Sequence, residues 1–194
     1  RRILHTLKEN DDGKFIKVAN IVGSTMKYHP HGDASIADAL VTLANKRYLI
    51  EGQGNYGNIY TGDPAAASRY IECRLTNLAR KEIYNKYLTE YVASYDGRNK
   101  EPVLFPCKIP LLLMLGAEGI AVGLSTKILP HNFIECLDAM IMVLQKKPIP
   151  TLLPDFQQGG VMDASDYDEG HGKIKIRAVI EKKDKAHLVI KELP

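Results

Sequence analysis

The sequence predicts an α+β fold in two parts. Apolar residues recur at helical spacing up to residue 47, and a strand, a glycine-rich loop and an alternating segment follow over 48–75. Beyond residue 100, apolar strands, one capped helix and a closing hairpin indicate a second mixed unit. We therefore expect one domain over 1–100 and another over 101–194.

The first part begins with helices. Apolar spacing predicts three of them, over 1–9, 14–26 and 34–47. Pro30 and Gly32 force a turn before the third helix, and Asp33 is expected to cap it. Two helices joined by a tight turn, with another helix before them, form a helix-turn-helix pattern.

A strand–loop–strand segment follows these helices. Residues 48–51 form a short apolar strand, and residues 69–75 alternate with a period of two. The alternation places three polar side chains on one face, those of Tyr70, Glu72 and Arg74. Thr76 is expected to cap a helix that runs to about Tyr91. Three helices and a strand–loop–strand wing predict a winged-helix domain.

The second part is also mixed. A cluster of prolines marks a boundary near residue 100: Pro102, Pro106 and Pro110. Beyond it we expect strands at "LLLML" and "GIAVGLS", a helix over about 133–146 capped by Asn132, and a loop to about residue 172. A hairpin made of "KIKIRAVIE" and "AHLVIKEL" closes the chain.

Composition is that of an ordinary globular protein, with 45% hydrophobic and 25% charged residues and a net charge of +3. The three cysteines lie far apart without metal-ligand spacing, which favours a reducing compartment. The apolar run at 109–124 is interrupted by Pro110, Gly116 and Glu118, so no membrane span is expected. The chain begins with Arg-Arg and ends with "KELP", which indicates a piece of a longer cytoplasmic protein.

Three glycines in the loop spell a dinucleotide-binding pattern, G-x-G-x-x-G: Gly52, Gly54 and Gly57. Such a loop must open directly onto a helix whose N–H groups hold the pyrophosphate. Here Gly57 is followed by "NIYTGDP", and Pro64 interrupts any helix. The pattern therefore does not indicate a nicotinamide cofactor.

Tyr70 is the residue whose surroundings most favour chemistry. Arg69 precedes it, Arg74 shares its face, and the Gly/Ala-rich segment 52–68 leaves room for a bulky ligand. A free phenol ionises near pH ~10, so a tyrosine nucleophile needs cationic neighbours or a metal. A phosphodiester matches those cations, and we expect Arg74 to contact it.

His29 and His31 flank Pro30 just before a predicted helix. They suit a phosphate, with Lys27 nearby, about as well as they suit ordinary turn histidines. As metal ligands their spacing is poor. The acidic run at 163–169 lacks the order of a calcium loop and is expected to be solvated.

Several segments together resemble, in order, the breakage–reunion region of type IIA DNA topoisomerases. They are "RRILHTL", "KYHPHGDASIADAL", "EGQGNYGNIYTGDPAAASRYIECRL", "SYDG", "KIPLLLMLGAEGIAVGLSTKILPHN" and "KELP". The resemblance covers nearly the whole chain and is closest to the bacterial A subunits of DNA gyrase and topoisomerase IV. It implies a winged-helix DNA-cleavage domain over 1–100 and the N-terminal part of a truncated tower domain over 101–194.

The resemblance also implies roles. Tyr70 would attack a DNA phosphorus and leave a 5′-phosphotyrosyl link, Arg69 would stabilise the transition-state charge, and His31 would lie near the reacting phosphate. Ile120 matches an isoleucine that wedges between base pairs, although its own pattern predicts a core strand position. The remaining DNA-backbone contacts implied are Arg1, Arg2, Lys27 and His29.

The resemblance implies partners that this chain does not replace. Mg²⁺ is held by the Toprim domain of a B-type subunit, which also binds ATP. Two A and two B subunits form a heterotetramer on double-stranded DNA, with a homodimer of the A type, in the cytoplasm on the nucleoid and without a membrane. This chain alone is therefore expected neither to relax nor to supercoil DNA, and no residue in it is expected to bind metal.

Two departures from the family pattern stand out. A hydroxyl residue usually follows "HGD", but here the position is Ala34, with Ser35 next and Asp38 one turn later. In the family, that hydroxyl and acid anchor fluoroquinolones through a water–metal bridge, so we expect a weakened quinolone contact. The segment "NKRYLIEG" is also shorter than usual.

Two questions stay open at this point. The sequence does not separate gyrase from topoisomerase IV. A second class of function is a non-catalytic winged-helix module, in which Tyr70 only packs against the DNA backbone.

Overall fold

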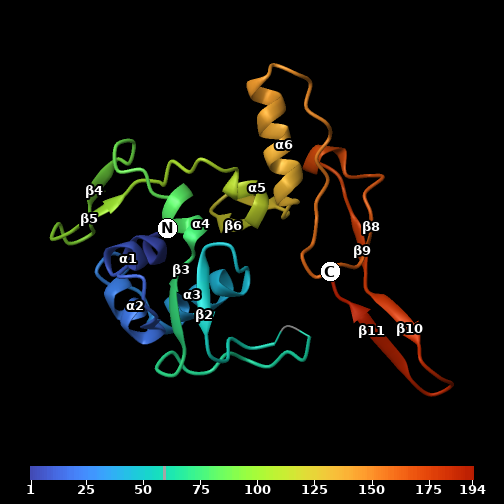
Figure 1. Ribbon diagram of the computed structural model, residues 1–194, viewed down its shortest axis with the longest axis horizontal. Helices are drawn as coiled ribbons and strands as arrows, with labels where there is room; N and C mark the ends of the chain where they lie inside the picture. Colours follow the sequence, from blue (N-terminus) through green and yellow to red (C-terminus); the bar gives the residue numbers. More distant parts are fainter. Residues whose placement is uncertain (59) are drawn as a thin grey trace. The chain divides into compact units, whose positions relative to one another are not determined.

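The computed structural model describes residues 1–58 and 60–194. The chain divides into two compact units, Arg1–Lys108 and Ile109–Pro194, and each combines helices with strands (Figure 1). The fold is therefore α+β in character, as the sequence predicts. Along the chain, the boundary between the two units falls between residues 108 and 109, a little after the position near residue 100 that the sequence predicts.

The first unit places four helices around a small sheet. The helices are α1 (Arg2–Glu9), α2 (Val18–Thr25), α3 (Asp33–Asn45) and α4 (Asn77–Glu82). The sheet is antiparallel with the order β1-β3-β2, and its strands are β1 (Ile16–Lys17), β2 (Ile50–Gln53) and β3 (Glu72–Leu75). A separate hairpin joins β4 (Tyr91–Ala93) to β5 (Lys100–Pro102).

The central strand β3 carries the predicted alternation. Ile71, Cys73 and Leu75 are buried, whereas Glu72 and Arg74 are only partly covered. This pattern confirms that one face of the segment looks into the core. The helices complete that core with buried apolar residues, among them Leu7, Val18, Ile21, Leu40 and Ala79.

The second predicted helix is shorter than expected at its start. The sequence predicts a helix over 14–26, but Ile16 and Lys17 pair with Cys73 and Glu72 of β3, so α2 begins at Val18. A strand pairing partner that lies far along the chain overrides the local helical spacing. The first predicted strand likewise shifts by two residues, to Ile50–Gln53, in register with β3.

Two helix ends also differ from expectation. Asp33 is the first residue of α3 rather than its cap, because Gly32 occupies the N-cap position. Thr76 does cap α4, since its hydroxyl accepts the N–H of Ala79 at 3.1 Å. However, α4 ends at Glu82 and not near Tyr91. The Asn85 side chain accepts backbone N–H bonds two and three residues further on, and this local turn replaces the helix.

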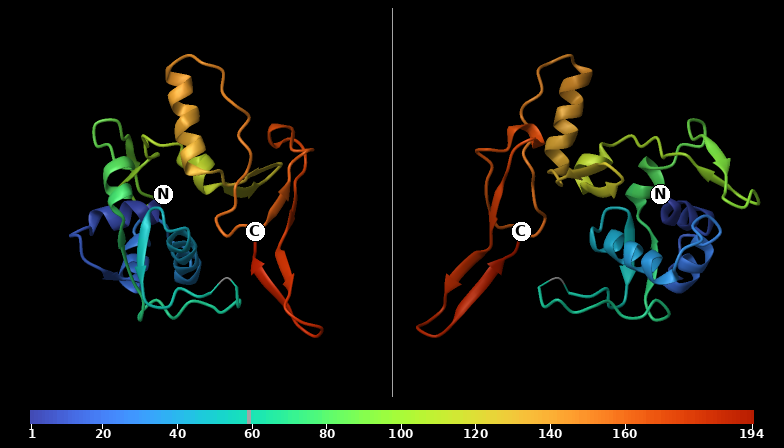
Figure 2. Two further views of the ribbon diagram at one scale, coloured as in Figure 1. Left: turned by 45° about the vertical axis from the view of Figure 1, so that its right-hand side comes forward. Right: turned by 180° about the vertical axis from the view of Figure 1, so that it is seen from behind.

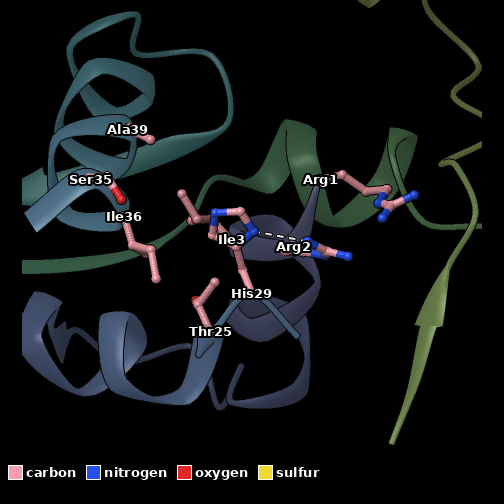
Figure 3. A pocket seen from close by; sticks show the side chains of 8 residues that line it. All are labelled: Arg1, Arg2, Ile3, Thr25, His29, Ser35, Ile36 and Ala39. Carbon is pink, nitrogen blue, oxygen red and sulfur yellow. Dashed lines mark hydrogen bonds between the residues drawn. The ribbon is translucent and has the colours of Figure 1, made fainter. Parts of the chain in front are cut away.

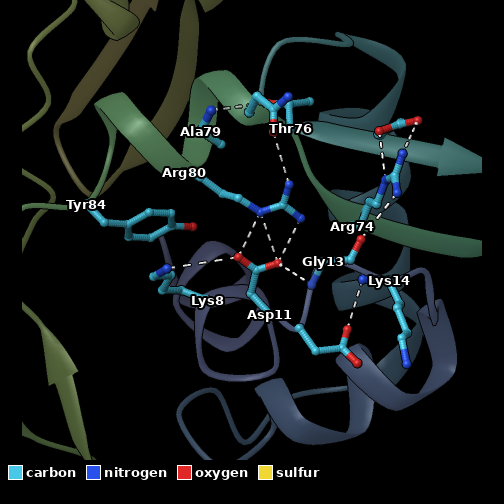
Figure 4. A network of polar contacts seen from close by, with 12 residues as sticks. Lys8, Asp11, Gly13, Lys14, Arg74, Thr76, Ala79, Arg80 and Tyr84 are labelled. Carbon is cyan, nitrogen blue, oxygen red and sulfur yellow. Dashed lines mark hydrogen bonds and ion pairs between the residues drawn. The ribbon is translucent and has the colours of Figure 1, made fainter.

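An ion pair fastens α4 to the loop after α1 (Figure 4). The Arg80 guanidinium donates to both Asp11 carboxylate oxygens, with its Nη2 2.8 Å from Oδ1 and its Nε 2.9 Å from Oδ2. Asp11 is nearly covered and also accepts the N–H of Gly13 at 3.3 Å. The guanidinium holds the pKa of Asp11 below its usual range.

The glycine-rich loop between β2 and β3 is held by specific contacts. The Tyr56 hydroxyl donates to the carbonyl of Glu72 at 2.7 Å, and the Asn45 amide donates to the carbonyl of Tyr56 at 3.0 Å. Gly57 has φ +85°, and a Cβ there would lie 2.7 Å from the carbonyl oxygen of Asp63. Gly57 therefore serves a loop that folds back on itself, and the described residues directly after it, 58 and 60–63, form a bridge and a turn rather than a helix.

The second unit consists of short helices and two-stranded ladders. Its elements are α5 (Leu111–Leu115), β6 (Ala117–Ala121), β7 (Leu124–Ile128), α6 (Phe133–Leu144), β8 (Val161–Asp163), η1 (Asp168–Gly170), β9 (Lys175–Arg177), β10 (Val179–Lys182) and β11 (Leu188–Glu192). The ladders are β6–β7, β8–β9 and β10–β11. The strands β10 and β11 form the predicted closing hairpin, which is drawn in red in Figure 2.

The segment "LLLML" is a helix, α5, and not the expected strand. Leucine and methionine lack β-branching and form helices readily, so the apolar run alone was ambiguous. Gly116 then ends the helix with φ +65°, a conformation that glycine adopts without strain. The predicted α6 and its Asn132 cap are confirmed, because the Asn132 side chain accepts the N–H groups of Ile134 and Glu135. The expected loop before residue 172 contains β8.

Few side chains are buried in the second unit. The apolar ones are Met114, Cys136, Ala139 and Pro154. Among the described residues, no helix combines the length and the apolar character that crossing a membrane requires.

Candidate nucleic-acid interface

A cavity of about 420 Å³ opens where α1, the turn after α2 and the start of α3 meet (Figure 3). Figure 3 shows cationic side chains from α1 on one side and residues of α3 on the other. Its lining residues are Arg1, Arg2, Ile3, Thr25, His29, Ser35, Ile36 and Ala39. Two guanidinium groups and an imidazole supply hydrogen-bond donors that suit an anion.

The two arginines are held by one carboxylate, that of Glu101 on β5. Arg2 donates to it with both sides of its fork, from Nε to Oε2 at 2.6 Å and from Nη2 to Oε1 at 2.8 Å. Arg1 donates from Nη2 to Oε2 at 2.9 Å. Glu101 is only 3% exposed, and the arginines hold its pKa below the usual range. Sequence reasoning missed Glu101, because nothing local links a residue of the hairpin to Arg1 and Arg2 about a hundred positions earlier.

His29 is joined to the same group. The Nη1 of Arg2 lies 2.9 Å from the Nδ1 of His29, and the ring of His31 lies 4.3 Å from that of His29, centroid to centroid. Burial lowers the pKa of His29, and the neighbouring charges of His31 and Arg2 lower it further. Lys27 is exposed just before these histidines, and its side chain forms no ion pair within the described part of the chain. The structure therefore brings Arg1, Arg2 and His29 together and leaves His31 and Lys27 exposed beside them.

Tyr70 lies on a turn before β3 rather than on the strand itself. Its N–H donates to the carbonyl of Ala67 at 2.8 Å, and its side chain is 65% exposed. The guanidinium carbon of Arg69 lies 4.6 Å from the centre of the Tyr70 ring. A phenol and a guanidinium are thus held next to each other at the surface.

The start of α2 fastens this turn on both sides. The N–H of Ala19 donates to the carbonyl of Ser68 at 3.1 Å, and the N–H of Val18 donates to that of Ile71 at 3.0 Å. The first N–H groups of a helix have no partner within the helix, so they are free to hold another segment. Arg69 and Tyr70 lie between the two carbonyls, and the backbone that carries them is fixed.

Arg74 has its charge paired. Its guanidinium donates to both oxygens of Glu51, at 2.9 and 3.0 Å, and to the carbonyl of Gly13 at 3.2 Å. It also lies 4.2 Å above the ring of Phe15. Arg74 is therefore positioned firmly, but its cation is already matched by a carboxylate.

Ala34 and Asp38 lie one turn apart on α3, and both are exposed. The hydroxyl of Ser35 does not take the place of the missing one at Ala34, because it donates to the carbonyl of Gly32 at 2.7 Å. Asp38 uses its backbone carbonyl to accept the hydroxyl of Thr42.

Ile120 belongs to the second unit, on β6, and its side chain is 88% exposed. The core position predicted from its apolar neighbours is wrong. The β6–β7 ladder has two strands, and a two-stranded ladder has no layer of its own to bury both faces. Val122 and Leu124 of the same hairpin are also exposed, so the hairpin presents an apolar tip.

Within the described residues, no group of three or more His, Cys, Asp and Glu side chains is arranged to hold a metal ion. No hydrogen bond or ion pair in that part of the chain joins Tyr70 to His29 or His31. Tyr70 with Arg69, and the histidines with Arg1 and Arg2, are thus two separate groups in the first unit.

Comparisons with known proteins place the whole chain. Residues 1–194 match the family model that describes the A subunit of DNA gyrase/topoisomerase IV. The chain is 58% identical over its full length to the A subunit of DNA topoisomerase 4 from Borreliella burgdorferi and covers 31% of that protein. It is 43% identical to the A subunit of DNA gyrase from Thermotoga maritima and covers 27% of it.

The chain thus spans about a third of these relatives or less. Its relatives include both gyrase and topoisomerase IV subunits, and the family model covers both kinds. The chain belongs to the family formed by the A subunits of DNA gyrase and topoisomerase IV.

Proposed function

We propose that this chain is the DNA-cleaving portion of a type IIA topoisomerase, within its A subunit. It would comprise a winged-helix domain over 1–100 and the N-terminal part of a tower domain over 101–194. The observation that carries the proposal is the exposed Tyr70, beside Arg69, on a turn that two N–H groups of α2 hold in place.

The reaction is a transesterification. The Tyr70 hydroxyl gives up its proton as its oxygen attacks a backbone phosphorus. The bond from phosphorus to the 3′ oxygen breaks, and that oxygen leaves with the electron pair and takes up a proton. A 5′-phosphotyrosyl diester remains. Because one phosphodiester replaces another, the reverse step reseals the strand.

Nearby groups would support the charge that develops on the phosphate. Arg69 is a cation beside the phenol, and His31 would supply a second donor to the reacting phosphate. The DNA backbone would lie across further cationic and polar side chains, Arg1, Arg2, Lys27, His29 and Arg74. Ile120, exposed on its hairpin, would wedge between base pairs and bend the duplex.

The remaining parts of the reaction are assigned to partners. Mg²⁺, held by the Toprim domain of a B-type subunit, would compensate charge on the phosphate. ATP would be bound and hydrolysed on that subunit. Two A and two B subunits would then cut both strands of double-stranded DNA and pass another segment through the break.

The test uses the intact A subunit, its Toprim-bearing partner, Mg²⁺ and supercoiled plasmid. After denaturation we expect protein attached to DNA 5′ ends, mapped to Tyr70 and absent in Tyr70→Phe. DNA binding without an adduct, when the partner is active with another A subunit, would instead support a non-catalytic DNA-binding module.

A further inference from the structure

Glu101 is a buried carboxylate that does no chemistry in the proposed reaction. It lies in the β4–β5 hairpin, and its two oxygens accept three N–H bonds from Arg1 and Arg2. The bidentate part of this contact, with Arg2, fixes the plane of the guanidinium as well as its position. Removing the carboxylate would take away the bidentate contact that orients Arg2, whereas Arg1 would keep its hydrogen bond to the carbonyl of Val103.

The orientation of Arg2 decides the proton position on His29. A guanidinium has five N–H donors and no acceptor. The Nη1 of Arg2 lies 2.9 Å from the Nδ1 of His29, so Nδ1 must accept this bond and cannot carry a proton. The ring is then neutral, with its one N–H on Nε2.

We propose that Glu101 is a positioning residue that acts through Arg2 to keep His29 as the neutral Nε2–H tautomer. This inference rests on the proposed function only in its purpose, which is to aim an N–H donor at a DNA phosphate oxygen. A histidine with the opposite tautomer would present a lone pair at Nε2 and repel that oxygen.

The groups that face His29 agree with a neutral ring. Arg2 approaches it from α1 and His31 from the same turn, and both oppose a positive charge on His29, while Glu101 on β5 favours one. The arginine fork stands between Glu101 and the imidazole. The carboxylate thus acts on His29 through Arg2, with no hydrogen bond of its own to the ring in the described structure.

The direct test is the histidine ¹⁵N spectrum of the chain, labelled at its six histidines. A His29→Gln variant assigns the His29 signals. We expect unprotonated Nδ1 and protonated Nε2 in the native chain at pH 7.5, and a mixture of both tautomers in Glu101→Ala. Glu101→Gln keeps the volume and one acceptor oxygen, so it should fold and show a smaller change.

Glu90→Gln is the matched control. Glu90 is an exposed acid just before the same hairpin, and its carboxylate has no ion pair within the described residues. It should leave the His29 spectrum unchanged. A native His29 with its proton on Nδ1, or an unaltered tautomer in a folded Glu101→Ala chain, would overturn the proposal.

A second readout measures adduct formation by the intact A subunit with its partner and Mg²⁺. We expect Glu101→Ala to slow it by between about tenfold and 100-fold, as a misplaced supporting group does. The two readouts test different claims, so one can fail without the other. An adduct that persists in Tyr70→Phe refutes the proposed function, whereas the tautomer result alone decides the role of Glu101.

Discussion

Arg69 lies against the ring of Tyr70, so its charge is close to wherever the phenol reacts. A donor aimed at developing phosphate charge contributes to the transition state far more than to DNA binding. We predict that Arg69→Gln lowers the rate of adduct formation by about 10²- to 10³-fold with little change in DNA affinity. Rapid-quench assays of the intact subunit with its partner measure the rate.

Arg98→Gln provides the comparison for Arg69. Arg98 is an exposed arginine in the β4–β5 turn, 3.9 Å from Asp96. The same charge is lost while Arg69 stays beside the Tyr70 ring, so adduct formation should stay near the native rate. Equal effects in the two variants would reduce Arg69 to a general contributor of positive charge.

Ala34 gives the start of α3 no side-chain hydroxyl at this position, and Ser35 turns its own hydroxyl to the carbonyl of Gly32. We predict that Ala34→Ser increases fluoroquinolone-stabilised cleavage, because the new hydroxyl lies one turn from Asp38 on the same exposed helix. Drug titration of cleavage complexes measures the effect. Native sensitivity at ordinary drug concentrations, unchanged by the substitution, contradicts it.

At the scale of elements, the Asp11–Arg80 pair joins α4 to the loop after α1. We predict that Asp11→Asn lowers the free energy of unfolding by about 2 kcal/mol, the order expected for hydrogen bonds to a charged group. Urea denaturation at pH 7 measures it. Asp12→Asn is the control, since exposed Asp12 accepts a bond from Lys14 alone and should cost much less.

The same pair has a pH signature. The folded pKa of Asp11 is lowered, so its contribution is present above the unfolded value of about 3.9 and is lost as pH falls through the folded value. The difference in stability between the native chain and Asp11→Asn should therefore shrink below about pH 4. A difference that stays constant down to pH 2 would show that the carboxylate charge is not its source.

The β6–β7 hairpin offers a second element to test. We predict that Ile120→Ala reduces DNA bending and adduct formation while binding persists, because the wedge and not the backbone contact is lost. Energy transfer between dyes at the ends of a short duplex reports the bend. Leu188→Ala, on the exposed face of β11, should leave the bend unchanged.

Sequence patterns predicted elements where local chemistry decides them. The Asn132 and Thr76 caps and the alternation through Ile71 and Cys73 all follow from neighbouring residues. Patterns failed where a distant partner decides. Ile16 pairs with Cys73, far along the chain, so α2 begins later than its local pattern predicts.

The candidate site shows the same limit. Local patterns raised Tyr70, Arg69 and the two histidines as candidates. The family resemblance then implied a role for each of them. Glu101 gave no signal, because a glutamate in a hairpin is ordinary until the fold brings Arg1 and Arg2 to it. Ile120 was misjudged from its apolar neighbours, since a short apolar run does not reveal whether a second layer covers it.

At the scale of the whole molecule, the chain covers about a third of its relatives or less. We predict that the chain alone binds DNA but leaves plasmid supercoiling unchanged, with or without Mg²⁺ and ATP. Agarose gels of plasmid topology check this, with the intact subunit plus its partner as the positive control. Relaxation by the chain alone, abolished in Tyr70→Phe, would show that the partner is dispensable.

The pairing of Arg74 with Glu51 has a consequence for how ions behave around the protein. A cation on an open surface gathers mobile anions, and DNA phosphates displace them into the bulk with a gain in entropy. The counterion of Arg74 is instead the Glu51 carboxylate, which is part of the same chain and cannot leave for the bulk solvent. A DNA phosphate that contacted Arg74 would exchange one bound anion for another, so this arginine would add to the fit of the duplex without adding its share to the salt dependence of binding.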